Sequence, residues 1–194
     1  MKTRLAMLAL ALPLAGCISF APKTPPSLLT LQPTESVAVG QQVSSATAKS
    51  ITVQVPAVPQ ALATARVPVQ ATATTVAYVA DALWVEVPAR LFARLLSDTV
   101  GARTGRVVLS GAQSFNDPGA RLGGELRQFG LDATTREALV TYDASLIRAD
   151  QTAVERRRFE ARVPVAAIDA ASAGPALNQA ANQVATQVAD WVGR

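Results

Sequence analysis

The sequence predicts an α+β fold: a two-layer sandwich in which a mainly antiparallel sheet carries two helices packed on one face. Short β-type runs alternate with only two runs of helical periodicity, in the order β-β-β-α-β-β-β-β-α. The apolar residues are mostly Ala, Val and Leu, and aromatic residues make up 5 % of the chain, which suits closely packed layers. A length of 194 residues leaves room for one ordinary domain and for no second large one.

Three strands are predicted before the first helix. Residues 50–55 alternate in polarity and end at Pro56, and residues 65–70 and 74–79 follow as a pair of strands. Pro68 has no backbone N–H to donate to a neighbouring strand. We therefore expect the strand that contains Pro68 to lie at an edge of the sheet.

The first helix is predicted to begin at Pro88 and to run to about Val100. Apolar side chains recur in it at four-residue spacing and so gather on one face, while charged side chains occupy another. The apolar face needs a sheet to cover it. It consists of Leu91, Phe92, Leu95 and Leu96.

Four further strands are predicted at residues 107–110, 122–132, 139–149 and 154–163. In residues 139–149 apolar and polar side chains alternate, so one face of that strand is buried and the other is wet. In residues 122–132 the alternation changes phase partway, which predicts a β-bulge near Gln128.

The last predicted helix follows Gly174, with Pro175 in its first turn. Its apolar residues form one stripe, which ordinarily packs on a sheet. The alternative is that the stripe and the surroundings of Trp84 enclose an acyl chain. The stripe consists of Leu177, Ala181, Val184, Val188 and Trp191.

The composition excludes most enzyme chemistry. The chain has no His and one Cys, which removes Ser-His-Asp and Cys-His catalysis, His-ligated zinc, Cys₄ metal sites and an intramolecular disulfide. Glu86, near Trp84 and Asp81, is the one place where a carboxylate could be desolvated. We favour the interpretation that Asp81 and Glu86 are loop and helix-start residues. We expect no enzyme, no metal and no cofactor.

The net charge of +4 does not indicate a nucleic-acid partner. Lys2 and Arg4 lie in a segment that we expect to be removed, and without them 16 basic residues face 14 acidic ones, a net charge of +2. The cluster Arg156-Arg157-Arg158 has two interpretations. It forms a patch for a lipid headgroup or a partner, or, as we favour, the solvated face of a strand opposite acidic neighbours.

The first residues have the layout of a secretory signal peptide. A basic start precedes an apolar run at residues 5–14, which is too short to cross a bilayer core of ~30 Å. The sequence Leu14-Ala15-Gly16-Cys17 resembles the bacterial lipobox, in which the thiol receives a diacylglycerol and the cysteine becomes the new N-terminus. We therefore expect a signal peptide at residues 1–16 and lipidation at Cys17. The alternative is an ordinary signal peptide cleaved nearby.

Residues 17–26 are predicted to be a tether between the lipid and a single domain at residues 27–194. The tether contains Pro22, Pro25 and Pro26, and such segments run extended. Two or three acyl chains hold a protein on a membrane that it does not span. Ile18 follows Cys17 where Gram-negative sorting uses Asp for inner-membrane retention. By resemblance to that rule we expect the outer membrane, facing the periplasm.

Several non-catalytic motifs occur in a characteristic order along nearly the whole chain. They are the lipobox ending at Cys17, the Pro-rich tether, and residues 28–31, 51–56, 62–69, 78–96, 124–129 and the terminal helix ending in Trp191. In these motifs the chain resembles the ABC-type transport auxiliary lipoproteins, a family that includes the paraquat-inducible C-type envelope lipoprotein. It departs from the family at Leu28-Leu29, where the family often has aromatic residues.

The resemblance implies a non-catalytic docking subunit of a lipid-transport system in the cell envelope. Its implied protein partners are the subunits of an ABC transporter and a mammalian-cell-entry domain protein. The lipid anchor would attach it to the membrane, and phospholipid is a candidate ligand. Residues that bind a ligand are not identified. The alternative is a free-standing periplasmic lipoprotein that binds a lipid or another small ligand.

Overall fold

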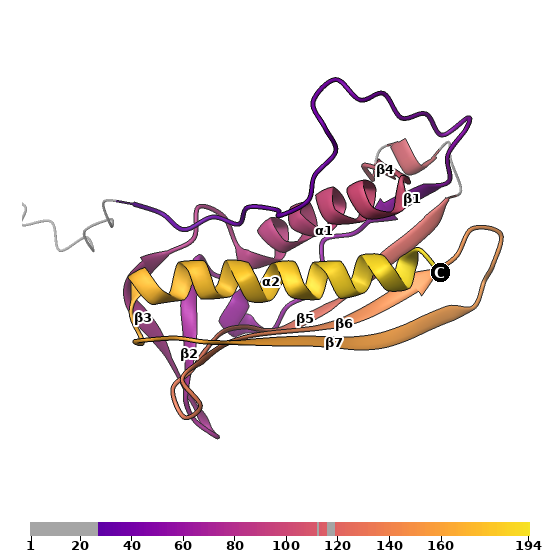
Figure 1. Cartoon of the computed structure of the whole chain (residues 1–194). Helices are drawn as coiled ribbons and strands as arrows, with labels where there is room; N and C mark the ends of the chain where they lie inside the picture. Colours follow the sequence, from indigo (N-terminus) through magenta and orange to yellow (C-terminus); the bar gives the residue numbers. More distant parts are fainter. Residues whose placement is uncertain (1–26, 112, 116–118) are drawn as a thin grey trace, which may run out of the picture.

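The computed structural model describes residues 27–111, 113–115 and 119–194, and the predicted signal peptide and tether lie outside them (Figure 1). The predicted α+β content and the predicted order of strands and helices are confirmed. In chain order the elements are β1 (Ser50–Val53), the short 3₁₀ helix η1 (Gln60–Leu62), β2 (Arg66–Thr72), β3 (Thr75–Leu83), α1 (Pro88–Thr104), β4 (Val107–Leu109), the 3₁₀ helix η2 (Gln113–Phe115), β5 (Ala120–Asp132), β6 (Glu137–Ile147), β7 (Val154–Pro164) and α2 (Ala170–Val192).

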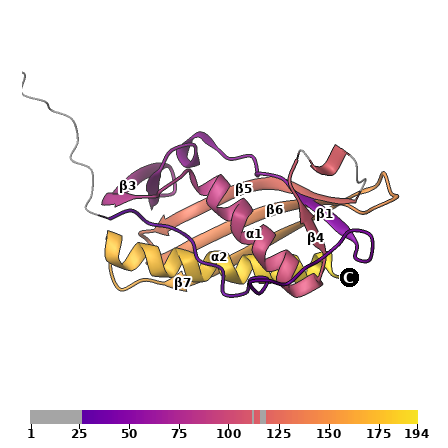
Figure 2. The ribbon, with the colours of Figure 1, turned by 90° about the horizontal axis from the view of Figure 1, so that it is seen from above.

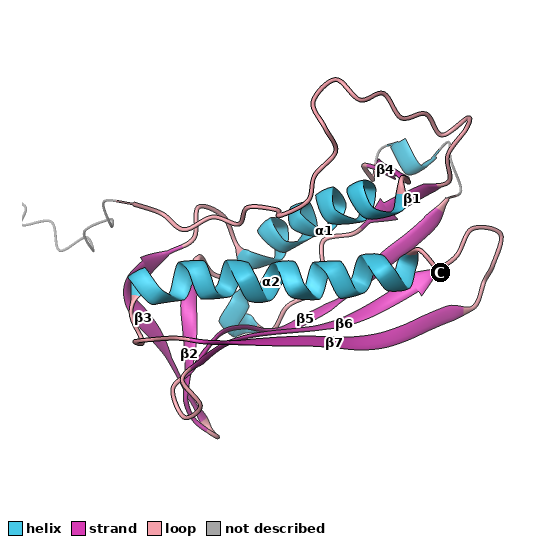
Figure 3. Cartoon of the chain, viewed as in Figure 1, coloured by secondary structure: helices cyan, strands magenta, loops and turns pink. Residues whose placement is uncertain are grey.

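The seven strands form one sheet, and both helices lie over the same face of it (Figures 2 and 3). The long strand β5 organises the sheet, because it pairs with β1 near its start, with β2 near its end and with β6 throughout. Beyond these, β4 pairs with β1, β3 with β2 and β7 with β6.

The expected mainly antiparallel sheet is not confirmed, because the sheet is mixed. The pairs β1–β4, β1–β5 and β2–β5 are parallel, and the pairs β2–β3, β5–β6 and β6–β7 are antiparallel. Alternating polarity tells which face of a sheet a side chain occupies, and it does not tell in which direction the neighbouring strand runs. The segment between β1 and β5 contains α1, and such a crossover returns the chain in the same direction.

The prediction that Pro68 marks an edge strand is wrong. β2 lies between β3 and β5. The proline is tolerated because the β2–β5 ladder is short and begins at Val69, after the proline. On β5, Gly130 lies so close to the backbone of Pro68 that a Cβ atom would overlap it.

The predicted bulge in β5 is confirmed. Leu126 pairs with Tyr142 and Gln128 pairs with Thr141, so Arg127 is the extra residue on β5. The bulge restores the apolar face of the strand, since Leu126 before it and Phe129 after it are both fully buried.

The first helix begins at Pro88 as predicted and ends at Thr104, later than the predicted end near Val100. The next residue, Gly105, caps it with a φ of 65°, the left-handed conformation typical of a helix C-cap. The second helix begins earlier than predicted. The Asp169 carboxylate caps it by accepting from the Ser172 N–H at 2.8 Å, so Pro175 is the sixth helical residue and not a first-turn residue. Near the start of a helix a proline removes only one backbone hydrogen bond.

Aromatic rings fill the core between the sheet and α1. The centroids of Trp84 and Phe129 lie 5.4 Å apart, and those of Phe92 and Tyr142 lie 5.2 Å apart, both edge to face. The Tyr142 hydroxyl donates to the Gly123 carbonyl at 2.6 Å, and burial raises the pKa of this hydroxyl. Aromatic side chains are few in this chain, and four of the described ones, Trp84, Phe92, Phe129 and Tyr142, contact one another in this cluster.

Candidate functional site

Residues 28–35, here called the strap, lie along the helical layer before the chain enters the sheet. The Leu29 N–H donates to the Leu83 carbonyl at 2.8 Å, and the Val85 N–H donates to the Leu29 carbonyl at 2.9 Å, so Leu29 of the strap lies beside the end of β3 in a parallel bridge to Trp84. Leu31 is buried among core residues. The strap therefore packs as part of the folded domain.

Two asparagines of α2 hold the middle of the strap. The Asn182 side chain is buried, and its Oδ1 accepts from the Thr34 N–H at 2.8 Å and from the Thr34 hydroxyl at 3.1 Å. Its Nδ2 donates to the Gln32 carbonyl at 2.9 Å and to the Asn178 carbonyl at 2.8 Å. The Asn178 Oδ1 accepts from the Gln32 N–H. Asn182 thus satisfies its full hydrogen-bonding capacity within the chain.

Arg103, in the last turn of α1, fastens the end of the strap. Its guanidinium contacts Asp190 of α2 and Glu35 of the strap, each at 2.7 Å. Hydrogen bonds to Asp190 and then to Glu35 raise the pKa of Arg103. One cation therefore joins both helices to the strap.

The strap and α2 run in the same direction, so the molecule has two distinct ends. At the end where residue 27 joins the strap, here called the N-terminal pole, lie the start of α2 and the strand β3 (Figure 1). The end of α2, the strand β4 and the β6–β7 connection lie at the opposite end, here called the distal pole (Figures 1 and 2). A helix of 23 residues separates the two by roughly 35 Å.

Residues 36–48, here called the arch, leave the strap and cross over the end of α1 before β1 begins (Figure 1). The arch contains no charged residue. It has a turn at Gly40, where φ is 84° and the Gln41 N–H donates to the Ala38 carbonyl, and a second turn where the Ser44 carbonyl accepts from the Thr47 N–H. Connections of this length without regular structure are uncommon within a domain and are usually either functional or linker segments.

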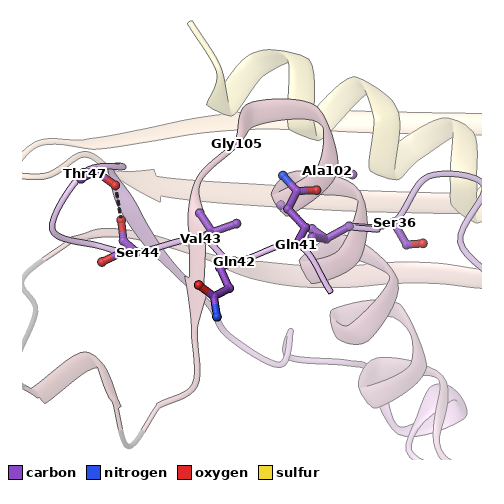
Figure 4. Close-up of a pocket in the computed structure, with 10 residues that line it drawn as sticks. Ser36, Gln41, Gln42, Val43, Ser44, Thr47, Ala102 and Gly105 are labelled. Atoms are coloured by element: carbon purple, nitrogen blue, oxygen red, sulfur yellow. Dashed lines mark hydrogen bonds between the residues drawn. The ribbon is translucent and has the colours of Figure 1, made fainter. Parts of the chain in front are cut away.

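A cavity of about 780 Å³ lies between the arch and the end of α1 (Figure 4). This volume is within the range of small-molecule sites, roughly 300–1,000 Å³. No ionisable side chain lines the cavity, so it offers hydroxyl, amide and aliphatic groups. The lining residues are Ser36, Val37, Gln41, Gln42, Val43, Ser44, Thr47, Gly101, Ala102 and Gly105.

A second cavity, of about 80 Å³, lies on the other face of the sheet, between η1, the β2–β3 hairpin and strands β5 and β6. Its walls include Leu62, Pro68, Val76 and Leu139. The volume is several-fold below that of a typical small-molecule site.

The predicted carboxylate position near Trp84 does not form a site. Trp84 is only 2 % exposed and belongs to the core, and its indole N–H has no hydrogen-bond partner among the described residues. Glu86 pairs with Arg94 of α1 at 2.7 Å, and Asp81 is exposed with a φ of 53°. Glu86 lies in the loop just before α1, as favoured from the sequence, whereas Asp81 is a residue of β3, so the interpretation of Asp81 as a loop or helix-start residue is wrong.

The stripe on the terminal helix is core, and the groove that a bound acyl chain would require is not formed there. All five residues of the stripe are at most 8 % exposed, and α2 packs on β6 and β7. Neither cavity described above is lined by the stripe or by Trp84.

The arginine cluster on β7 is a solvated strand face, the interpretation favoured from the sequence. Arg158 makes a bidentate pair with Asp143 of β6, at 2.6 and 2.7 Å. Arg157 lies on the opposite face of the strand, with its guanidinium 5.1 Å from the centroid of the Phe159 ring. Hydrogen bonding to Arg158 is the main cause that lowers the pKa of Asp143.

The structure brings together residues that the sequence reasoning missed. Asn182 and the arch were not singled out, and Cys17, the predicted lipidation site, lies outside the described residues. Asn178 and Asn182, four residues apart in a helix of Ala and Val, are the signal that could have indicated a polar contact on α2.

Neither long helix of the described chain has the length and apolarity needed to span a membrane. Within residues 27–111, 113–115 and 119–194, no cluster of acidic or thiol side chains is placed to hold a metal ion.

Comparison with known proteins identifies the fold and the family. The family model described as "ABC-type transport auxiliary lipoprotein component" matches residues 29–189. The crystal structure of XCC0632 from Xanthomonas campestris, of the family DUF330, is similar with a TM-score of 0.64 at 20 % identity, over 87 % of this chain and 92 % of that chain. A second crystal structure, of an uncharacterized protein, has a TM-score of 0.62 at 15 % identity, over 74 % and 90 %. No curated protein matches the sequence.

Proposed function

The chain belongs to the family of ABC-type transport auxiliary lipoproteins, and from this we propose that it is a lipid-anchored, non-catalytic docking subunit of a lipid-transport system in the periplasm. The observation that carries the proposal is the family match, which runs from the strap to α2. In the proposed system, ATP hydrolysis belongs to the transporter, and a mammalian-cell-entry domain protein forms the conduit. This subunit supplies a rigid surface held at the outer membrane.

The arrangement of the N-terminal segment supports an anchoring role. Leu14-Ala15-Gly16-Cys17 supplies the lipobox, and nine residues separate Cys17 from residue 27. An extended Pro-rich segment spans ~3 Å per residue, so the tether can hold the domain up to about 30 Å from the lipid. The strap then joins the tether to both helices through Asn182 and Arg103.

The nature of the cavities supports a non-catalytic role. The larger one is lined by neutral side chains, and the carboxylate and arginine groups singled out from the sequence are engaged in ion pairs or exposed on the surface. A nucleophile and a base at hydrogen-bond distance would be needed for acyl transfer. The described lining residues of the larger cavity include no such pair.

The anchor is tested by Cys17→Ala in the full chain. We expect the variant to lose labelling by a fatty-acid analogue and to leave the membrane fraction, while its domain keeps the same thermal unfolding midpoint. Thr24→Ala, in the same tether, is the matched control and should behave as the native chain. Unchanged labelling and fractionation of Cys17→Ala would contradict the proposed anchor.

The docking role is tested by isolating the tagged, lipidated protein from membranes in mild detergent. We expect the mammalian-cell-entry protein and the transporter subunits to be recovered with it. Native mass spectrometry of the same sample distinguishes the free-standing lipid binder, which would carry lipid and no protein partner. Recovery of the tagged chain alone, after crosslinking in cells, would contradict the docking role.

A further inference from the structure

The arch exposes apolar side chains that the fold does not use. Val39 is fully exposed, and Val37 and Val43 are about 40 % exposed. Exposed apolar groups gathered on one surface of a soluble domain indicate a contact with another molecule. Val37 and Val43 also line the neutral cavity on the inner side of the arch, whereas Val39 lies outside the cavity lining.

The charge distribution selects the kind of molecule that fits. Glu35 and Lys49 flank the arch, and the 13 residues between them carry no charge. A charged ligand would lose its hydration at this surface without gaining an opposite charge. An uncharged occupant is not penalised in this way.

The amide side chains at the cavity indicate which hydrogen-bonding groups the uncharged occupant carries. Gln41 and Gln42 project from the arch (Figure 4), and neither side chain has a hydrogen-bond partner among the described residues. Each amide has two donor hydrogens and an acceptor oxygen, the same groups that an extended main chain pairs with. Exposed valines beside free amides suit a polypeptide segment with small or apolar side chains.

The position of the arch indicates which kind of molecule can reach it. The chain joins the strap at the N-terminal pole, and the arch lies at the distal pole, roughly 35 Å away along α2 (Figure 1). With the tether fixed to a membrane, the lipid surface is reached most readily by the N-terminal pole. The arch is then available to another protein of the same compartment.

We propose that the arch and the cavity beneath it are the surface on which the domain docks an extended, uncharged segment of a protein partner in the periplasm. This inference rests on the proposed docking function and names the surface that performs it. The contact residues on this side are Val39 and Val43 for apolar groups and Gln41 and Gln42 for the main chain.

The test places a photoreactive benzoylphenylalanine in the full, lipidated chain at Val39, or, as the matched control, at Val76. Val76 is a 48 % exposed valine of β3, outside the arch. We expect irradiation of cells to give an adduct with one protein from position 39 and none with that protein from position 76. The crosslinked peptide of the partner should be free of Asp, Glu, Lys and Arg around the attachment point.

The partner identified in this way is then purified, and its affinity is measured for Val39→Asp and Val76→Asp. We expect Val39→Asp to weaken binding about tenfold or more and Val76→Asp to bind like the native chain, with unchanged unfolding midpoints for both. Normal binding by Val39→Asp, or an adduct from Val39 with a second copy of this chain, with lipid or with a charged segment, overturns the inference.

The outcomes separate this inference from the docking function itself. If the transporter proteins are recovered with the native chain and yet position 39 gives no adduct with them, the docking function stands and the arch is not its surface. If no transporter protein is recovered and neither position gives a protein adduct, both are overturned.

Discussion

At the scale of single residues, Trp84 is the side chain whose role is clearest. It is the largest of the fully buried side chains, and it contacts the Phe129 ring edge to face. Its backbone also joins three segments, because the Trp84 N–H donates to the Ala65 carbonyl at 2.7 Å and the residue bridges to Leu29 of the strap. The ring therefore lies where the strap, β3 and the core meet.

Trp84→Ala is expected to lower the free energy of unfolding by ~3 kcal/mol or more, because the substitution leaves a large cavity in a filled core. Urea unfolding followed by circular dichroism measures the change. Val85→Ala, at the neighbouring 51 % exposed residue, is the control and should change the free energy by about 0.5 kcal/mol or less. Equal effects of the two substitutions would contradict the core assignment.

Asp143 makes the stability depend on pH in the acid range. Hydrogen bonding to Arg158 holds the pKa of the folded carboxyl below its ordinary value, so its contribution is present above the unfolded pKa of about 3.9 and is lost as the pH falls through the folded pKa. Asp143→Asn should therefore lower the free energy of unfolding at pH 7 by at most about 1 kcal/mol. At pH 3 the difference from the native chain should be smaller.

The measurement is urea unfolding of both proteins at pH 7 and pH 3. Asp150→Asn is the control, because the exposed Asp150 makes no ion pair in the described part of the chain. A difference between native and Asp143→Asn that grows toward pH 3 would show that the carboxylate is not stabilised by its arginine partner.

Single residues also differ in whether their surroundings can be predicted from the sequence. The solvated interpretation of Arg158 followed from pattern and composition and holds in the structure. The burial of Trp84 did not follow, because the sequence left open whether its ring lies in the core or lines a ligand site. Asn182 did not follow, because a polar residue in an apolar helix usually faces solvent. Its partners Gln32 and Thr34 are about 150 residues away in the sequence, and only the folded chain brings them together.

At the scale of elements, periodicity predicts each strand and helix well but not its partner. The bulge near Gln128 follows from the change of phase within β5 itself. The parallel pairing of β1 with β5 depends on the path of the chain between the two strands, and the alternation of polarity within a strand does not indicate that path. The start of α2 was missed because Pro175 resembled a helix start more than Asp169 did, although the Asp169 cap forms the actual one.

Gly101→Ala in α1 is expected to raise the free energy of unfolding by about 0.5–1 kcal/mol, because glycine in a helix costs conformational entropy. A Cβ at this position would lie 3.5 Å from Val37 and from Val108, which is ordinary contact. Thermal unfolding measures the gain. Gly105→Ala is the matched control, and at a φ of 65° it should destabilise the protein instead. A loss at Gly101 would mean that the arch packs more tightly there than the geometry indicates.

At the scale of the whole molecule, the strap makes the N-terminal segment part of the domain and gives the domain two unlike poles. The sequence predicts a domain that begins at residue 27, but it does not predict the cavity. It forms between a stretch without periodicity and the end of a helix some 60 residues later in the chain. Neither segment alone has a pattern that indicates a site.

Removing the strap is expected to destabilise the entire domain. A chain of residues 36–194 should unfold with a free energy roughly 3 kcal/mol or more below that of residues 27–194, because it loses the burial of Leu31 and of part of Leu29, together with the asparagine hydrogen bonds. Urea unfolding of the two soluble chains measures this. Equal stability would show that the strap is a separable appendage.

The parallel course of the strap and α2 also has a mechanical consequence. Traction applied to the chain upstream of residue 27 is directed along the strap, so the contacts at Leu29, Asn178, Asn182 and Arg103 are loaded together in shear. Contacts that are loaded in shear share the applied force. Contacts that open one after another each bear the whole force in turn. With the proposed lipid anchor in place, a pull from the membrane would therefore turn the domain as a rigid body and leave its interior undisturbed.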